Sequence, residues 1–347
     1  MNFRAIVSGV SLLALGLSTG CYSGPDAFTE SGTIVERQIV LNGPENNGLI
    51  FNGFMFNGFQ FNGFILNGFQ FNGFHFNGFL INGSEMIVTV ENNGEIIEAS
   101  SAELLGSELL ITTQKVVGGE VTEVETEIRI DDVYPSPKAD DVFYHLLSAY
   151  DAELDDWVPL CSDGQGNQTE AILLAGGWDN ATGARIESDK PTATFACRGD
   201  VLAKCVEMGY APWREAEVKT GKKHGKHGKT KVVTLADHHQ ACTRMLRADY
   251  CGTGEPNTVN GTLIDVADKV EPDPIQAYES KWDYEAEWGP DGAVCIGDSL
   301  RTQLFENQDG YEMPSCINDI PETKKCGKLK KTYKTGALLG TRFELPK

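Results

Sequence analysis

Side chains that could do chemistry gather between positions 238 and 250 of the sequence. The run His238-His239-Gln-Ala-Cys242 combines imidazole and thiol groups, which are good zinc ligands. On a helix, His238 and Cys242 would share one face, whereas adjacent histidines diverge by about 100° and cannot both face one ion. Further along, Asp249 could act as a general base with His239.

Each of these residues also has a structural interpretation. In an oxidising compartment Cys242 would be disulfide-bonded and lost as a metal ligand. Asp249 could pair with Arg244 or Arg247 while the next residue, Tyr250, fills the core at a helix exit docked by a disulfide. We favour the structural interpretation and therefore predict no metal and no cofactor. The sequence contains no GxSxG, HExxH or P-loop motif.

Two helices and many strands are predicted to position these residues. One helix spans Asp200 to Met208 and stops at Gly209, and the other runs from about Leu235 to Arg247. Alternation of apolar and polar residues predicts most of the remaining elements as strands. They are Met86–Val90, Leu109–Thr113, Glu125–Ile130, Val142–Tyr150, Ala171–Trp178, Thr192–Cys197, Leu263–Val266 and a hairpin of Tyr284–Trp288 with Ala293–Ile296, and Gly118-Gly119 marks a turn.

The cysteines indicate a covalently crosslinked C-terminal half. Apart from Cys21, eight cysteines follow position 160, namely Cys161, Cys197, Cys205, Cys242, Cys251, Cys295, Cys316 and Cys326. An even number in an exported chain predicts four disulfides, and no pair has the CxxC spacing of redox or zinc-ribbon sites. Because a short loop is easily closed, we expect Cys316 to pair with Cys326 and the other six to pair within 161–295.

The first residues predict export and a lipid anchor. Arg4, an apolar run from Ala5 to Leu17, and small residues before Cys21 form a signal peptide that is too short to span a bilayer. Small residues directly before a cysteine resemble the bacterial lipobox, whose thiol is lipidated after cleavage. The alternative is ordinary secretion with Cys21 merely near the cut. No later segment is long and apolar enough to span a membrane, so the lipid is the expected anchor.

A repeat of five residues occupies positions 41–83. Asn-Gly recurs nine times without a slip, and Phe follows most of the glycines. A fixed short period predicts a solenoid whose units bury apolar faces on their neighbours, and the segment resembles the pentapeptide-repeat family of square β-helices. Two large side chains per unit would overfill a narrow core, so either the coil is wider or one Phe row faces outward as an apolar surface. We expect the segment not to fold alone.

A second resemblance covers the C-terminal half. It rests on Phe195-Ala-Cys-Arg-Gly, Gly209-Tyr-Ala-Pro-Trp213, His239-Gln-Ala-Cys-Thr-Arg-Met and Ala248-Asp249-Tyr250-Cys251. These runs resemble the ADYC domain, which implies an exported protein and carries no established activity. One departure from the resemblance is Lys219 to Lys231, a Gly-Lys-His insertion predicted as an exposed loop, with binding of an anionic polysaccharide or metal ion as the alternative. Asp163-Gly-Gln-Gly-Asn167 suggests a calcium-binding turn but lacks the EF-hand spacing and its terminal Glu.

Charge and composition complete the prediction. The formal net charge of −21 argues against a nucleic-acid partner. We predict a mostly β, α+β protein with a signal peptide (1–20), a tether (21–40), a pentapeptide-repeat β-solenoid (41–84), and a disulfide-rich domain with two or more helices (85–347, core about 140–300). We expect it to be anchored to the bacterial outer membrane, as a non-enzymatic module that binds an envelope protein or polysaccharide or has a structural role. The alternative is an exported hydrolase or metal-binding enzyme that uses His238, His239 and Asp249.

The anchor can be tested by replacing its cysteine. Cys21→Ser should move the protein from the membrane fraction to the soluble exported fraction, because the buried acyl chains supply the binding energy. Fractionation and a high-salt wash measure the change. A variant that stays with membranes after the wash would show that lipid on Cys21 is not the anchor.

Overall fold

The computed structural model describes most of the chain after position 74 and short segments before it. The described residues are 39–42, 50–51, 54–55, 59–62, 70–71, 74–92, 95–117, 120–163, 166–179, 182–186, 192–219, 230–259, 261–271, 281–306, 310–318, 325–326 and 336–345. The signal peptide, Cys21, the tether up to residue 38, the Gly118-Gly119 turn and residues 220–229 of the insertion lie outside them. Within the part that is described, no helix has the length and apolar character needed to cross a lipid bilayer.

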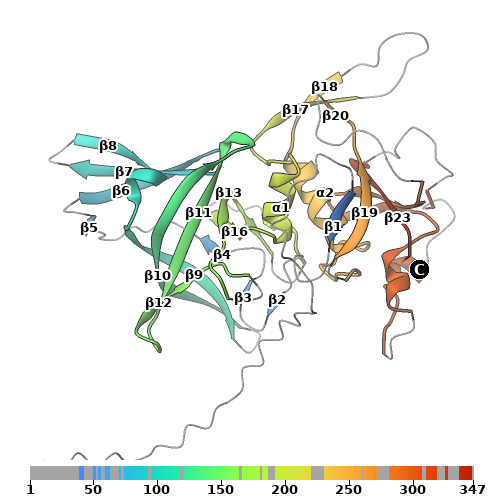
Figure 1. Cartoon of the computed structure of the whole chain (residues 1–347), viewed down its shortest axis with the longest axis horizontal. Coiled ribbons are helices and arrows are strands. Elements are labelled where there is room, and N and C mark those ends of the chain that lie inside the picture. The colour runs from blue at the N-terminus through green and yellow to red at the C-terminus, as the bar shows by residue number, and fades with distance from the viewer. Residues whose placement is uncertain are drawn as a thin grey trace, which may run out of the picture.

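A seven-stranded sheet dominates the first half of the domain (Figure 1). Its order is β10 (Glu120–Ser136), β9 (Glu108–Val117), β4 (Phe59–Asn62), β16 (Thr192–Cys197), β13 (Ala171–Ala175), β11 (Ala139–Asp151) and β12 (Asp156–Pro159). The long strand β10 pairs with β9 through its first part and with β11 through its second part, so the sheet closes on itself. All of these pairings are antiparallel.

Alternation along the strands gives the closed sheet an inner and an outer apolar layer. On β13, Ala171 and Leu173 belong to the inner core with residues of β10, β11 and β16. The intervening Ile172 and Leu174 pack outward against α1 (Val201–Glu207). Strand β13 is therefore buried on both faces, which explains its continuous apolar sequence.

The second half of the domain is a five-stranded sheet packed against a helix. The sheet order is β1 (Ile39–Asn42), β19 (Thr262–Ala267), β23 (Leu339–Phe343), β21 (Asp283–Gly289) and β22 (Gly292–Ile296). The helix α2 (Ala236–Arg247) shares one core with residues of this sheet, including Trp288 and Leu339. A small sheet of β18 (Thr230–Thr234), β17 (Glu215–Lys219) and β20 (Val270–Glu271) lies beside it.

The remaining elements form smaller units. A four-stranded sheet has the order β5 (Gln70–Phe71), β6 (Phe74–Asn82), β7 (Glu85–Asn92) and β8 (Glu95–Ser100). Two-residue strands form the pairs β2 (Ile50–Phe51) with β3 (Phe54–Met55) and β14 (Gly177–Trp178) with β15 (Arg185–Ile186). The 3-10 helices η2 (Ser101–Leu104) and η3 (Arg301–Leu304) and the helix α3 (Ser315–Asn318) complete the fold.

The prediction of a mostly β protein with two or more helices is confirmed, since α1, α2 and α3 accompany the strands in the described part of the chain. The predicted helices correspond to α1 and α2, and the predicted hairpin corresponds to β21 and β22. In the repeat segment, the described backbone of β1, β4 and β6 pairs with β19, with β9 and β16, and with β7. The solenoid over 41–83 stays a prediction, because about half of its residues lie outside those described.

The four disulfides have a different connectivity from the one expected. They join Cys161 to Cys197, Cys205 to Cys242, Cys251 to Cys316 and Cys295 to Cys326. The predicted pairing of Cys316 with Cys326 is therefore wrong, as is confinement of the other six to 161–295. The pairing follows from the tertiary structure, which brings the two parts of the tail to different places. The helix α3 lies next to the end of α2. Further along, the backbone N–H of Cys326 donates to Ile296 O on β22 at 2.7 Å.

Candidate functional site

Helix α2 carries the histidines and the cysteine that could have formed a metal site. Cys242 is bonded to Cys205 of α1, so its thiol is not available to a metal. The ring of His238 stacks on Tyr210 with centroids 6.3 Å apart. His239 packs against Trp178 at 5.6 Å, and its Nε2 lies 3.1 Å from Leu202 O. The two imidazoles therefore face different neighbours, as their adjacent positions on a helix require.

Burial keeps both imidazoles uncharged. It lowers the pKa of His238 to about 4, although the charge of Asp237 acts in the opposite direction. Burial likewise lowers the pKa of His239 to about 4, where the hydrogen bond to Leu202 opposes the shift. Among the described residues, no three His, Cys, Asp or Glu side chains come together as a metal site.

A serine–histidine pair elsewhere in the fold is also enclosed. Ser101 Oγ lies 3.1 Å from Nε2 of His145, and both residues are fully buried. The same hydroxyl donates to Met86 O at 2.9 Å and accepts from Met86 N at 2.8 Å. The pair therefore links η2 to the start of β7 inside the inner core of the closed sheet, where a substrate could not reach it.

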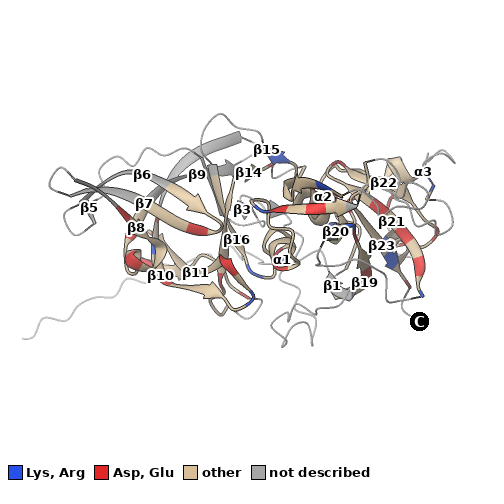
Figure 2. Ribbon diagram, turned by 90° about the horizontal axis from the view of Figure 1, so that it is seen from above, with Lys and Arg blue, Asp and Glu red and all other residues tan. Residues whose placement is uncertain are grey.

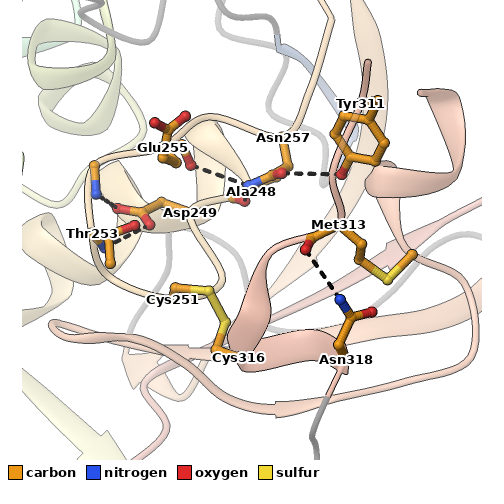
Figure 3. The surroundings of a disulfide bond; sticks show 11 residues. Ala248, Asp249, Cys251, Thr253, Glu255, Asn257, Tyr311, Met313, Cys316 and Asn318 are labelled. Carbon is orange, nitrogen blue, oxygen red and sulfur yellow. Dashed lines mark hydrogen bonds between the residues drawn. A yellow bond between two sulfur atoms is a disulfide. The ribbon is translucent and has the colours of Figure 1, made fainter. Parts of the chain in front are cut away.

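Asp249 is committed to the turn that follows α2 (Figure 3). One of its oxygens accepts from Nη1 of Arg244 at 2.6 Å and from the backbone N–H of Gly254 at 2.9 Å, and the other accepts from Thr253 N at 3.0 Å. Both side chains of the ion pair are almost completely buried. The predicted pairing with Arg244 is therefore present, and no hydrogen bond joins the described side chains of Asp249 and His239.

The side chain of Tyr250 lies in the core that α2 shares with the five-stranded sheet. Its hydroxyl donates to Oε1 of Glu285 at 2.6 Å and accepts from Arg301 N at 2.9 Å. The guanidinium of Arg301 binds the same Glu285 oxygen at 2.7 Å and donates to the carbonyls of Met245 and Leu246 at the end of α2. Tyr250 therefore joins a helix end, β21 and η3 through one buried polar network.

The residues on either side complete the corner. Ala248 ends α2 in the left-handed conformation, with φ 51° and ψ 39°, and its carbonyl accepts from Asn257 Nδ2 at 3.0 Å. Cys251 then bonds to Cys316 of α3 (Figure 3). In the run Ala248-Asp249-Tyr250-Cys251, the first residue thus ends the helix, the second anchors the loop, the third links to the core and the fourth forms the crosslink.

The comparison with known families agrees with this motif. The family model of the ADYC domain matches residues 101–302, which is more than half of the chain. The chain belongs to the ADYC domain family. No curated protein and no solved structure matches it. The match spans most of the closed sheet, both longer helices and the 248–251 corner, whereas the repeats and the C-terminal tail lie outside it.

A surface of the ADYC domain that sequence reasoning missed lies on the outside of β10, β11 and β12 and on the segment before β13. We call it the outer aromatic face, and it consists of Arg129, Asp131, Ser148, Tyr150, Trp157 and Gln168. Tyr150 and Trp157 are cross-strand partners whose rings meet edge to face at 5.6 Å. The guanidinium carbon of Arg129 lies 4.8 Å from the centroid of the Trp157 ring. Both aromatic residues remain partly exposed.

Polar groups frame these rings. Asp131 accepts from Nε of Arg129 at 2.6 Å, from Ser148 Oγ at 2.5 Å and from Gln168 Nε2 at 2.9 Å. Burial raises the pKa of Asp131, but the three hydrogen bonds outweigh it, so the pKa lies below its usual value and the carboxylate is ionised. The alternation of Arg129 and Asp131 with the buried Ile128 and Ile130 was the available signal, because it places both polar residues on the outer side.

The anchoring role of Asp249 predicts a large loss of stability in Asp249→Ala. The substitution leaves the Arg244 charge buried without its carboxylate and removes the acceptor of two backbone N–H groups. We expect the free energy of unfolding to fall by about 3–5 kcal/mol, measured by denaturant unfolding. Asp237→Ala, at a less buried position of the same helix, is the control and should change it by no more than about 1 kcal/mol. Equal effects would contradict the assignment.

The buried histidines predict acid sensitivity. The pKa of His239 is about 4 in the folded protein and about 6.5 when unfolded, so between these values the unfolded chain binds more protons. Stability from this residue is therefore complete above pH 6.5 and is lost as the pH falls toward 4. From pH 7 to 5, wild type should lose about 2 kcal/mol more than His239→Gln. Other titrating groups cancel in this difference, and equal losses would contradict burial of a neutral imidazole.

Proposed function

We propose that this ADYC protein is an exported, lipid-anchored module that binds a polysaccharide of the cell envelope and has no catalytic activity. The observation that carries the proposal is the outer aromatic face, which offers accessible rings framed by hydrogen-bonding groups. The residues with the chemistry of an active site are instead buried and committed to contacts within the fold. The rival function, a hydrolase or metal enzyme using His238, His239 and Asp249, would need these residues to be reachable.

The composition of the outer aromatic face favours a sugar as ligand. A sugar ring has an apolar C–H face that packs on an aromatic ring, and a polar edge that hydrogen-bonds to carboxylate, amide and guanidinium groups. Trp157 and Tyr150 supply the rings, while Asp131, Gln168 and Arg129 supply donors and acceptors. The acidic chain (Figure 2) favours a neutral or cationic polymer over a strongly anionic one.

The proposed location follows from export. Disulfides persist in oxidising compartments, and the four disulfides of the domain support a place outside the cytoplasm. Acyl chains on Cys21 would hold the protein at the outer membrane, with residues 22–38 as a tether. An anchored module of this kind would keep its ligand close to the cell surface.

Trp157→Ala tests the proposed site. The mature protein would be incubated with purified envelope polysaccharide and, separately, with envelope proteins free of polysaccharide. Loss of one stacking ring should weaken polysaccharide binding about tenfold, which corresponds to about 1.4 kcal/mol, while the melting temperature stays near that of wild type. Phe305→Ala, a partly exposed aromatic residue in the other half of the domain, is the control and should bind normally.

Three outcomes would overturn the proposal. Binding that Trp157→Ala leaves unchanged would place the site elsewhere. Capture of an envelope protein without any polysaccharide would replace the ligand class. Cleavage of the polysaccharide, lost in a His239 variant that still folds, would establish the enzyme.

A further inference from the structure

The closed sheet contains one strand that the ADYC family match does not supply. Six of its strands lie within residues 108–197, but β4 comes from the repeats. Strand β4 pairs with β16 through four residue pairs, from Phe59 opposite Phe195 to Asn62 opposite Thr192. Among the described residues, it pairs with β9 through Phe61 opposite Thr113. We call the position between β9 and β16 the strand slot.

The sequence that fills the strand slot occurs twice in the chain. Residues 57–64 read Asn-Gly-Phe-Gln-Phe-Asn-Gly-Phe, and residues 67–74 are identical to them. The second copy of the sequence includes β5, a two-residue strand at the edge of the four-stranded sheet, where Gln70 pairs with His75. Part of each copy is therefore a strand: Phe59–Asn62 in a central position and Gln70–Phe71 at an edge.

Backbone pairing cannot distinguish the two segments. A strand added between two others gains main-chain hydrogen bonds whatever its side chains, and its side chains set the specificity. Because the two segments have identical side chains, either one satisfies the strand slot equally well. Edge strands such as β5 are also the usual donors in pairing between chains.

The position of β6 determines whether residues 67–74 can be inserted by the same chain or by a second molecule. Strand β6 begins at Phe74, the last residue of the second segment, and pairs with β7 up to Asn82. Within one chain, moving 67–74 into the strand slot would pull the start of β6 from β7. A second molecule does not have this conflict, because its β6 and β7 approach together with the donated segment.

We propose that the strand slot is an interaction site for a second copy of this chain, which inserts its residues 67–74 between β9 and β16 when β4 is displaced. Among the described residues, β4 is held mainly by its four pairs with β16, since only Phe61 pairs with β9. Insertion of residues 67–74 from a neighbouring molecule would restore the backbone hydrogen bonding to β9 and β16. Each copy both accepts and donates a segment, so exchange gives reciprocal dimers or longer chains.

Gln60→Pro tests the exchange in the full mature protein. Proline removes a backbone N–H and is excluded from central strands, so the variant's own β4 cannot fill the strand slot. We expect Gln60→Pro to form dimers or larger species in sedimentation velocity, at concentrations at least about tenfold below those at which wild type does so. The matched control Gln70→Pro leaves β4 intact and should remain a monomer.

A peptide separates strand exchange from simple aggregation. An eight-residue peptide with the duplicated sequence should bind Gln60→Pro, occupy the strand slot and convert its oligomers to monomers. The same peptide with proline in place of glutamine should have no effect. The double variant Gln60→Pro/Gln70→Pro should lose the specific dimers. A monomeric Gln60→Pro, or oligomers that respond to both peptides or to neither, would overturn the proposal.

Wild-type chains give a second readout if Gln60→Pro does not fold. Two populations with different affinity tags would be unfolded, reduced, and refolded together under oxidising conditions. Mixed species that carry both tags should form, and the duplicated peptide should reduce their yield at least about tenfold relative to the proline peptide. A yield that neither peptide changes would overturn the proposal.

Discussion

A pair of opposite charges joins α2, β21 and η3 inside the core that α2 shares with the five-stranded sheet. Glu285 and Arg301 are fully buried, and neither charge could remain there without the other, because an unpaired buried ion is strongly unfavourable. Arg301 also caps the last carbonyls of α2, and Tyr250 reaches the same carboxylate. Helix, sheet and corner must therefore assemble together. The signature motif of the family marks where the chain enters this network.

The sequence predicted individual elements well because their signals are local. Alternating residues in 125–130 and a glycine stop at Gly209 are properties of a few neighbouring residues, and β10 and α1 formed as expected. The partners of these elements depend on distant contacts. Nothing near Phe59 indicates that its strand lies beside β16, and nothing near Cys316 indicates Cys251 as its partner. No local feature of the sequence indicated that the sheet closes through the two halves of β10.

For the candidate site too, local features were predicted and contacts between distant residues were not. The period of a helix correctly separated His238 from His239, and the even number of cysteines correctly predicted a disulfide at Cys242. The depth of burial could not be predicted, because it depends on Trp178 and Tyr210, which are remote in sequence. The outer aromatic face was missed because Trp157 and Arg129 meet only after β11 brings their strands together. Residues chosen for their chemistry were structural, and ordinary strand residues formed the accessible surface.

The interlaced crosslinks have a consequence for biogenesis. Cys251 and Cys295 precede Cys316 and Cys326, and the two bonds overlap along the chain. A chain that crosses a membrane from its N-terminus and is oxidised as each thiol emerges would join Cys251 to Cys295 and Cys316 to Cys326. For such a chain, correct pairing requires that two thiols wait for the tail or that a disulfide isomerase corrects the first bonds. The two overlapping bonds thus make the yield of correctly bonded protein depend on the redox conditions and isomerase activity under which the chain is oxidised.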